Sequence, residues 1–288
     1  MTDEVSFQRR YGPWALIAGG SEGIGRSFAL QLASRGLHLI LVARRQERLE
    51  ATAQEIHERF GVQVSQHAED LTAPDLERRL DTLVAGREIG MLVYNAGATH
   101  GAGLLLDTPI EDARKLVHLN CLGPLTAVHL LGSRMRARGR GGIILMSSMS
   151  ALAGGGYVAT YAATKAFDRV LAEGLWWEFG PCGVDVLGLL AGATATPAMA
   201  RSTVRYDRAG TTAGQAAMQK LSITPMDPDD VAREALEHLG HGPIWIAGEQ
   251  NRATAERLSR TPREEVIRLM SEASAKLHGL APPKRADG

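Results

Sequence analysis

The sequence is short of cysteine, of excess charge and of long hydrophobic runs, and each shortage excludes a class of protein. Cys121 and Cys182 are the two cysteines in 288 residues, and they lack metal-ligand spacing, which favours a reduced protein. The 32 basic and 32 acidic residues cancel, so no nucleic-acid partner is indicated. No apolar run approaches the roughly 20 residues of a membrane span, and the acidic start MTDEVS is no signal peptide. We expect a soluble, cytoplasmic protein with no metal site.

Apolar residues make up 44% of the chain and glycines number 32, which suits a compact enzyme-like domain. Strand and helix patterns alternate, and the run LHLILVA at 37–43 reads as a strand buried on both faces, typical of parallel sheets. No internal repeat or domain boundary is seen. We therefore predict one domain over 1–288, with a core at about 10–250, a lid at about 193–225 and a C-terminal helical extension at about 251–280.

A glycine-rich turn separates the first predicted strand, 14–18, from a helix predicted over 26–35. The turn reads Gly19-Gly20-Ser21-Glu22-Gly23-Ile24-Gly25. Residues without side chains let the backbone approach a pyrophosphate, which can then sit on the amides of a helix N-terminus. The turn predicts a dinucleotide site; a tight turn without a ligand is the alternative.

Arginines follow the second strand where NAD-binding βαβ units carry a carboxylate for the ribose 2′-hydroxyl. Here the sequence is Ala43-Arg44-Arg45, and the planar, permanently charged guanidinium of Arg44 suits a phosphate dianion. Arg44 could instead merely begin a charged helix. We predict NADP(H) in preference to NAD(H).

Polar or small residues end the next two strands, predicted over 62–66 and 89–94. Asp70 could accept a hydrogen bond from an adenine amino group or cap a helix predicted over 74–85. Asn95-Ala96-Gly97 closes the fourth strand, at the sheet edge where open α/β sheets bind ligands.

Asn120 stands inside the apolar run LVHLNCLGPLTAVHLL of a long helical stretch predicted over 108–138. A buried amide must find partners or cost free energy, and Pro124 is expected to bend the helix. Two interpretations stay open. Asn120 either satisfies a backbone group freed at the kink or holds a water that feeds protons to Lys165.

The most informative stretch is IILMSSMSALAGGGYVATYAATK, which delivers Ser147 and Ser148 to the end of a strand at 143–146. A helix over 159–179 then places Tyr161 and Lys165 four residues apart on one face. A phenol beside a fixed ammonium ionises more readily than its ordinary value of about 10. Such a pair fits general acid–base catalysis on a carbonyl or alcohol.

After a sixth strand over 184–190 the chain continues Ala191-Gly192-Ala193-Thr194-Ala195-Thr196-Pro197, and its Ala-, Thr- and Met-rich continuation suits a lid. Asp227-Pro228 predicts the start of a helix ending at His238, before a seventh strand at 244–247. Thr261 to Glu264 reads as a capping box for a last helix ending near His278.

Taken together these motifs resemble the short-chain dehydrogenase/reductase family over about residues 10–250. Its glycine motif is similar to Ala18–Gly25, its N-A-G to Asn95–Gly97 and its Y-x-x-x-K to Tyr161–Lys165. The serine normally lies 13 positions before the tyrosine, which selects Ser148 over Ser147. Two departures are Ala18 and Ala191, where the family has Thr and Pro; we expect them to change stability or affinity rather than abolish activity.

The resemblance implies an α/β, Rossmann-type doubly wound parallel sheet of about seven strands with helices on both faces. It also implies NAD(P)-linked carbonyl/alcohol chemistry, with Asn120, Ser148, Tyr161 and Lys165 as the catalytic set. Tyr161 would be the general acid/base, and Lys165 would anchor the nicotinamide ribose. The implied cofactor contacts are Gly19, Ser21, Gly23, Ile24, Gly25, Arg44, Arg45, Asp70, Leu71, Asn95, Ala96, Gly97, Tyr161, Lys165, Gly192, Thr194 and Thr196.

Pocket walls from 100–106, 151–158 and the lid favour a mostly apolar ketone or secondary alcohol, contacted by Ser148, Tyr157 and Met199. Tyr157 stacks on a substrate ring or simply packs. Two other functions stay open: a catalytically silent NADP(H) sensor, or a binding protein for an apolar metabolite. By analogy with the family we expect a homodimer or homotetramer formed through the helices at 109–138 and 159–179.

Overall fold

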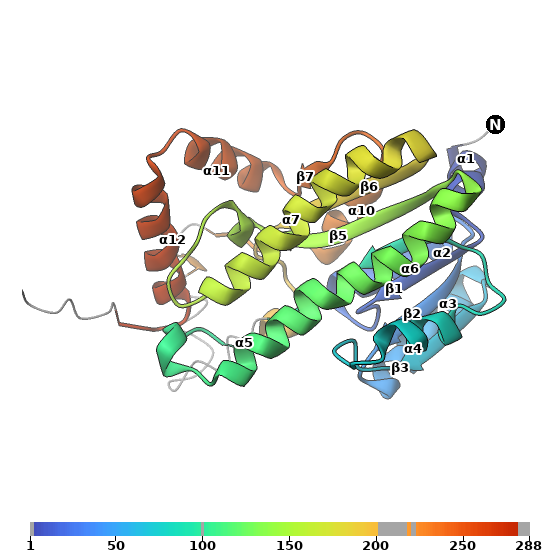
Figure 1. Cartoon of the computed structure of the whole chain (residues 1–288), viewed down its shortest axis with the longest axis horizontal. Helices are drawn as coiled ribbons and strands as arrows, with labels where there is room; N and C mark the ends of the chain where they lie inside the picture. Colours follow the sequence, from blue (N-terminus) through green and yellow to red (C-terminus); the bar gives the residue numbers. More distant parts are fainter. Residues whose placement is uncertain (1–2, 99–100, 201–217, 220–222, 282–288) are drawn as a thin grey trace, which may run out of the picture.

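The computed structural model describes residues 3–98, 101–200, 218–219 and 223–281. At its centre is a parallel sheet of seven strands in the order β3-β2-β1-β4-β5-β6-β7 (Figure 1). The predicted Rossmann-type fold is confirmed. The strand bounds are β1 (Trp14–Ala18), β2 (His38–Ala43), β3 (Val64–Ala68), β4 (Ile89–Tyr94), β5 (Gly141–Ser148), β6 (Val184–Ala191) and β7 (Ile244–Ile246).

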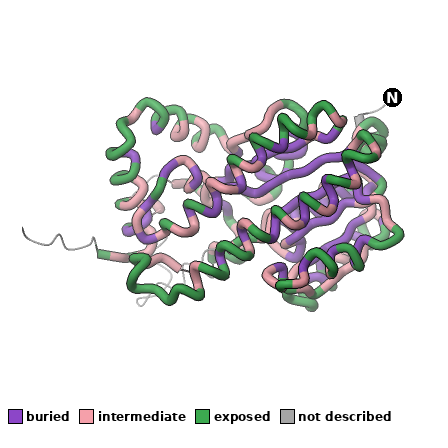
Figure 2. The backbone as a smooth tube through the Cα atoms, in the orientation of Figure 1, coloured by how far each residue is buried: buried purple, intermediate pink, exposed green. Residues whose placement is uncertain are grey.

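The central strands are apolar on both faces, because successive side chains of a strand point to opposite sides and helices cover both. In β1, Leu16 and Ile17 are both fully buried but belong to separate core clusters. β4 is buried over its whole length, and the strands form the buried interior of Figure 2. Truncating such a leucine to alanine costs about 2–5 kcal/mol, so this double core supplies much of the fold's stability.

Helices cover the sheet in two layers. On one face, Phe28 of α2, Ile56 of α3 and Val231 of α10 pack against the sheet, and on the other face Leu80 of α4, Leu131 of α6 and Ala172 of α7 do so. The bounds of these helices are α2 (Gly23–Ser34), α3 (Gln46–Phe60), α4 (Leu76–Leu83), α6 (Gly123–Arg138), α7 (Ala159–Phe179) and α10 (Pro228–His238).

One helix was not predicted from the sequence. The segment before the first strand forms α1 (Asp3–Tyr11). The Tyr11 hydroxyl donates to Asp185 Oδ2 (2.6 Å), and the Arg10 guanidinium pairs with the same carboxylate. The sequence signal was weak, since only Phe7 and Tyr11 of α1 join the core.

The long helical stretch predicted over 108–138 is divided by a wide π turn. α5 (Ile110–Val117) leads into the π turn at His118–Leu122, and α6 follows without a break. The π turn therefore lies just before Pro124, a residue that has no backbone N–H to donate. A bend of the helix axis at Pro124 stays a prediction, and the irregular turn that the structure shows lies just before it.

By length and composition alone the run Ile110–Arg138 could cross a membrane, but half of its most apolar window is buried inside the domain. A core helix of a folded domain passes the same test. The expectation of no membrane span stays a prediction.

The helix caps agree only in part with the sequence. Asp227 caps α10 as predicted, since its Oδ1 accepts from Asp229 N (2.8 Å). The capping box at Thr261 is wrong: Pro262 occupies the cap position of α12 (Arg263–Leu277), and Thr261 Oγ1 donates backwards to Arg257 O (2.9 Å).

The C-terminal extension packs on the loop that follows β5. After α11 (Glu249–Ser259), α12 lies across this loop, and Ser271 Oγ accepts from Gly156 N (2.7 Å) (Figure 1). A small apolar cluster of Ala153, Leu258 and Val266 joins the two segments. The predicted lid at 193–225 falls largely outside the described residues.

Parallel register brings the carboxyl ends of the strands to one edge. Ala18 pairs with Tyr94, and Ser148 pairs with Ala191. The strand order reverses between β1 and β4, and at such a switch point open α/β sheets bind ligands. Gly19, Asn95 and Gly192 directly follow strands that end at this edge, and Ser148 is the last residue of β5.

Candidate active site

The glycine turn between β1 and α2 is built so that side chains would not fit. Gly19 has a φ of +82°, and a Cβ there would lie 2.8 Å from Ala96 N. A Cβ on Gly25 would meet Gly19 O at 2.0 Å. α2 begins at Gly23, three residues earlier than predicted, and no side chain caps its N-terminus. Its N-cap residue, Glu22, makes no capping bond through its side chain, which suits a helix N-terminus that binds an anion.

The arginines after β2 have different partners. Arg45 and Arg48 both pair with the Glu22 carboxylate of the glycine turn. Arg44 is exposed and makes no hydrogen bond or ion pair within the part of the chain that the structure describes. Of the two arginines predicted to bind a phosphate, Arg45 forms an ion pair, whereas Arg44 forms none with the residues that the structure describes.

Asp70 forms a local turn. Its Oδ1 accepts from Thr72 N (2.9 Å) and Thr72 Oγ1 (2.8 Å), and these bonds, aided by the charge of Arg44, lower the pKa of Asp70. The predicted cap is wrong, because Asp75 holds the cap position of α4. The Leu71 side chain is buried in the core. Contacts of either residue with a cofactor stay predictions.

The segment after β4 ties the glycine turn to the lysine of α7. Asn95 Nδ2 donates to Gly19 O (3.1 Å), and Ala96 N donates to Ala18 O (2.8 Å). A Cβ on Gly97 would lie 3.1 Å from Lys165 Nζ. The glycine at position 97 therefore allows Lys165 Nζ to lie close to the backbone of the segment after β4.

Asn120 is fully buried in the π turn. Its Oδ1 accepts from Ala98 N (3.4 Å), and its Nδ2 donates to Ala98 O (3.4 Å) and Thr164 Oγ1 (3.0 Å). These bonds join the π turn to the N-A-G segment and to α7. The suggestion that Asn120 satisfies backbone freed at a proline kink is wrong, and a role in holding a water stays a prediction.

The two serines at the end of β5 point to different surroundings. Ser147 is buried and donates to Lys165 O (2.6 Å). Ser148 is half-buried, and its Oγ accepts from Ser150 N (3.2 Å). The Ser148 hydroxyl proton has no acceptor among the described residues. Ser147 therefore bonds β5 to α7, whereas the Ser148 hydroxyl accepts one bond and donates none to the described residues.

Tyr161 and Lys165 share one face of α7, as predicted. Tyr161 is half-buried, and its phenol has no hydrogen-bond partner within the described segments. Lys165 is buried, and its Nζ donates to Met146 O (2.7 Å) and Asp168 Oδ2 (2.9 Å). Burial opposes the charge of Lys165 most strongly, but the charges of Asp168 and then Tyr161 outweigh it and raise the pKa of Lys165.

The sequence analysis does not predict a role for Asp168. The available signal is its position, three residues after Lys165 in the otherwise largely apolar run KAFDRVLAEG. Asp168 is 2% exposed, and burial raises its pKa to about 6 against the lowering effect of Lys165. A buried ion pair between Lys165 and Asp168 thus lies on the helix that carries Tyr161.

The loop after β6 reaches the glycine turn. Thr196 packs so closely on Gly23 that a Cβ there would lie 2.9 Å from Thr196 Cγ2. Thr194 is buried and donates to Gly192 O (3.1 Å). Met199 N donates to Thr196 Oγ1 (3.1 Å), which places Met199 at the start of the predicted lid.

Tyr157 is held by the C-terminal extension. It is buried, has an unusual φ of +69°, and donates its hydroxyl to Ala281 O (2.7 Å). These contacts agree with the alternative that Tyr157 packs within the fold. A contact of Tyr157 with the substrate stays a prediction.

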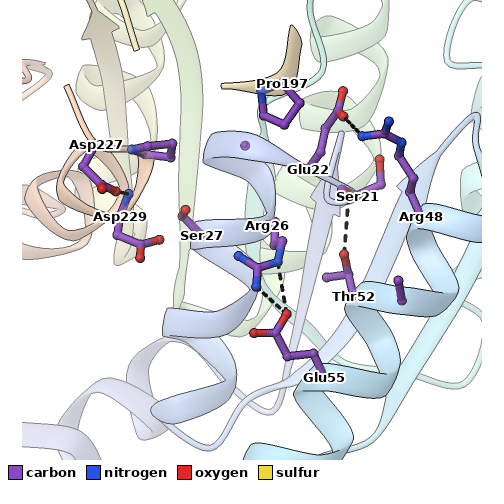
Figure 3. A pocket seen from close by; sticks show the side chains of 13 residues that line it. Ser21, Glu22, Arg26, Ser27, Arg48, Thr52, Glu55, Pro197, Asp227 and Asp229 are labelled. Atoms are coloured by element: carbon purple, nitrogen blue, oxygen red, sulfur yellow. Dashed lines mark hydrogen bonds and ion pairs between the residues drawn. The ribbon is translucent and has the colours of Figure 1, made fainter. Parts of the chain in front are cut away.

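A cavity of about 450 Å³ lies between α2, α3 and the start of α10 (Figure 3). Ser21, Glu22 and Gly23 line it, and the Arg26–Glu55 ion pair lies within it. It contains none of Ser148, Tyr161 and Lys165, so it is not the substrate site. The described residues contain no cluster of three potential metal ligands, and both cysteines are unpaired.

Comparison with known proteins identifies the class. Residues 13–207 match the short chain dehydrogenase family model, and the chain belongs to that family. It is an oxidoreductase acting on CH–OH and C=O groups with NAD(P).

Two relatives and one solved structure are similar to this chain over much of its length. A 7beta-hydroxysteroid dehydrogenase from Clostridium sardiniense is 30% identical over 263 residues, covering 91% of this chain and 96% of the relative. A very-long-chain 3-oxoacyl-CoA reductase from Podospora anserina is 37% identical over 185 residues, covering 62% of this chain and 54% of the relative. A structure described for 7beta-hydroxysteroid dehydrogenase stereoselectivity superposes with a TM-score of 0.82 at 29% identity, covering 92% of this chain and 98% of that one.

The residues of the site fit a nicotinamide dinucleotide. The N-terminus of α2 offers uncapped amides beside glycines that leave no room for side chains. One Lys165 proton remains after Met146 and Asp168 have taken two. Arg44 adds an exposed cation at the end of β2.

Proposed function

We propose that the protein is an NADP(H)-dependent oxidoreductase that interconverts a mostly apolar ketone and its secondary alcohol, with Tyr161 as general acid/base. One observation carries the proposal. Ser148, Tyr161 and Lys165 lie on two neighbouring elements, β5 and α7, and among the described residues neither the Ser148 hydroxyl proton nor the Tyr161 phenol has a hydrogen-bond partner.

The chain's own groups divide the work. Ser148 donates a hydrogen bond to the substrate oxygen and holds it beside Tyr161. In the reducing direction Tyr161 gives that oxygen a proton from its phenol, and in the oxidising direction it takes the proton back. Lys165 holds positive charge next to the phenol and offers its remaining proton to the ribose. Asn120 supports a water route for protons toward Lys165. A bound NADPH supplies the hydride.

An apolar substrate is supported by the surface near the site. Gly103 N donates to Tyr157 O (2.9 Å), so the segment 103–106 starts against the loop that follows β5. The next three residues, Leu104, Leu105 and Leu106, are 36%, 52% and 94% exposed. Exposed leucines in a row suit a pocket rim that an apolar substrate covers. The relatives named for steroid and long-chain acyl substrates agree with this proposal.

The preference for NADP(H) depends on Arg44. A relative from Sphingobium yanoikuyae, 28% identical with a TM-score of 0.72 over 86% of this chain and 94% of that one, has been solved in complex with NADPH. In this chain Arg44→Asp should shift the NADPH/NADH preference toward NADH by about tenfold or more, since a dianion would then face a carboxylate. Arg59→Ala, at the far end of α3, is the control. An unchanged ratio would refute the role of Arg44.

Steady-state turnover with a panel of ketones tests the function. Tyr161→Phe should reduce kcat by at least about 10²-fold while NADPH still binds, because the proton donor is lost and the ring remains. Tyr11→Phe, which removes a phenol at the opposite end of the sheet, should keep kcat. Full activity of Tyr161→Phe, or no NADPH consumption with any ketone, would end the proposal.

An assembly through α7 is also proposed. An apolar groove of about 500 Å³ runs along its outer face, and its exposed Val170 suits a symmetric contact. Light scattering should show a dimer or tetramer, and Val170→Glu should shift it toward the monomer. We also propose a cytoplasmic location.

A further inference from the structure

Asp168 lies one turn beyond Lys165 on α7 and faces the same interior. Its Oδ2 accepts from Lys165 Nζ at 2.9 Å, and the two side chains are 3% and 6% exposed. Asp168 Oδ1 is buried and has no hydrogen-bond partner in the described part of the chain. A carboxylate that uses one oxygen of two is poorly solvated, so its interaction with Lys165 is the main compensation for its burial.

Other groups around the pair come from two further elements. Tyr94 of β4 donates its hydroxyl to Leu119 O (3.0 Å), and Cys121 lies in the π turn. Burial and then the charge of Asp168 raise the pKa of both, to about 11 for Cys121. These groups are neutral near pH 7, and the phenol of Tyr161 completes the set on α7. The balance of charge in this interior therefore rests on Lys165 and Asp168.

The hydrogen bonds of Lys165 show why its charge matters. An ammonium has three protons and no lone pair, whereas a neutral amine has two protons and one lone pair. Met146 O and Asp168 Oδ2 take two protons. A charged Lys165 thus has one donor left for a ribose hydroxyl, and a neutral Lys165 would have none.

We propose that Asp168 is a positioning residue that keeps Lys165 charged and aims its third proton at the cofactor. The inference rests on the proposed function and adds a residue that acts through Lys165 rather than on the substrate. Without Asp168 a buried lysine favours its neutral form. The site would then lose its ribose donor and the positive charge beside Tyr161.

The direct test is the titration of Lys165 in the protein without cofactor, followed by NMR on ε-¹³C-labelled lysine, with Lys165→Met to assign the signal. In the parent protein the lysine should stay charged up to at least pH 10. In Asp168→Asn its pKa should fall by about 2 units or more. A parent Lys165 that titrates below pH 9 would overturn the inference, even if Asp168→Asn does not fold.

NADPH affinity, measured by fluorescence titration, gives the second readout. At pH 6.5 Asp168→Asn should bind within about threefold of the parent, because Lys165 is still charged. At pH 9.5 its affinity should be lower by about tenfold or more. A folding defect would not recover on acidification, so a loss of equal size at both pH values means that Asp168 is only structural.

Two further variants sharpen the outcome. Asp168→Glu keeps the carboxylate and should restore the affinity at pH 9.5, whereas the matched control Glu173→Gln, an exposed acid on the same helix, should bind like the parent throughout. If the NADPH affinities of the parent and the variants differ as expected at the two pH values but the parent reduces no ketone, the proposed function fails and the inference stands. If ketones are reduced and Asp168→Asn binds like the parent at pH 9.5, the inference alone fails.

Discussion

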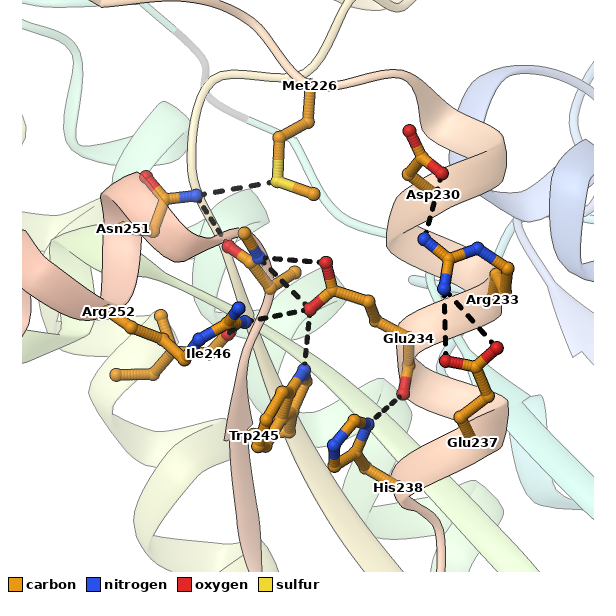
Figure 4. Close-up of polar contacts among 12 residues, drawn as sticks. Met226, Asp230, Arg233, Glu234, Glu237, His238, Trp245, Ile246, Asn251 and Arg252 are labelled. Atoms are coloured by element: carbon orange, nitrogen blue, oxygen red, sulfur yellow. Dashed lines mark hydrogen bonds and ion pairs between the residues drawn. The ribbon is translucent and has the colours of Figure 1, made fainter.

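Two carboxylates inside the domain, Asp168 and Glu234, show opposite ways of holding a charge. Glu234 Oε2 of α10 accepts from Trp245 Nε1 (2.8 Å) and Arg252 Nη1 (2.9 Å), and Gly248 N donates to both Oε1 (3.2 Å) and Oε2 (3.1 Å), so both oxygens are used (Figure 4). Asp168 uses one oxygen, toward Lys165, and leaves the other without a partner.

The pKa values differ in the same sense. The hydrogen bonds and the charge of Arg252 outweigh burial and lower the pKa of Glu234, whereas burial raises that of Asp168 to about 6. Glu234 is 14% exposed and is bonded by three residues that follow α10 in the chain. The comparison indicates that Glu234 bonds β7 and the segment after it to α10, whereas Asp168 has Lys165 as its partner.

The largest effect on stability is expected when Lys165, the cation beside Asp168, is removed. Lys165→Met should lower the free energy of unfolding at pH 8 by about 3–5 kcal/mol, because a buried carboxylate is left unpaired. The pKa of Asp168 is already raised, and without lysine it rises further. The carboxyl is then protonated in the folded state below that pKa, so the variant should regain stability as pH falls from 8 to 5. Thermal unfolding at both pH values measures it.

Lys115→Met, at an exposed position of α5, is the control and should change stability by less than about 0.5 kcal/mol. Equal stability of Lys165→Met and the parent at pH 8 would show that the Asp168–Lys165 pair does not carry charge.

The second prediction concerns Glu234. Glu234→Gln should cost about 2 kcal/mol at pH 7, since hydrogen bonds to a charged acceptor become bonds to a neutral one. A carboxylate with a lowered folded pKa stabilises the fold above its unfolded pKa, and this is lost as pH falls through the folded value. The difference between parent and variant should therefore shrink below about pH 4.5. Urea unfolding at pH 7 and pH 4 checks it, and a difference that grows on acidification contradicts the assignment.

The smallest effect is expected at Ser147, which supports Lys165 through its backbone. Ser147→Ala should cost about 1 kcal/mol, since one buried hydrogen bond is lost. Ser133→Ala, where an exposed hydroxyl donates to Leu130 O, should cost less and serves as control. Chemical denaturation of the two variants decides it. An identical loss in both would mean that the Ser147 bond adds nothing to stability.

The sequence predicted the fold and the order of the motifs because both depend on local patterns. Buried parallel strands are continuous apolar runs, and α7 and β4 have the predicted bounds. The site residues follow from spacing, since Tyr161 and Lys165 share a helix face and glycines mark close backbone approaches. The separation of Ser147 from Ser148 follows from the alternation of a strand.

What the sequence did not predict depends on contacts between distant segments. α1 is bonded through Asp185, 174 residues from Tyr11, and the left-handed Tyr157 is bonded through Ala281. The Thr261 capping box failed because a matching pattern does not decide which backbone group a hydroxyl meets. Asp168 was overlooked since an acid in a helix is usually solvated, and its burial follows only from the packing of α7 on β5 and β6.

The π turn at His118–Leu122 determines how α5 is rotated relative to α6, so the number of residues between the two helices matters. A wide turn amounts to one extra residue in an otherwise regular helix. Deleting one residue there would narrow the turn to the α pattern, yet it would rotate α5 by about 100° relative to α6. Leu116, the buried residue of α5, would swing to another side of the helix, and Asn120 would lose its alignment with Ala98 and Thr164. Chain length in this segment is therefore as constrained as residue identity.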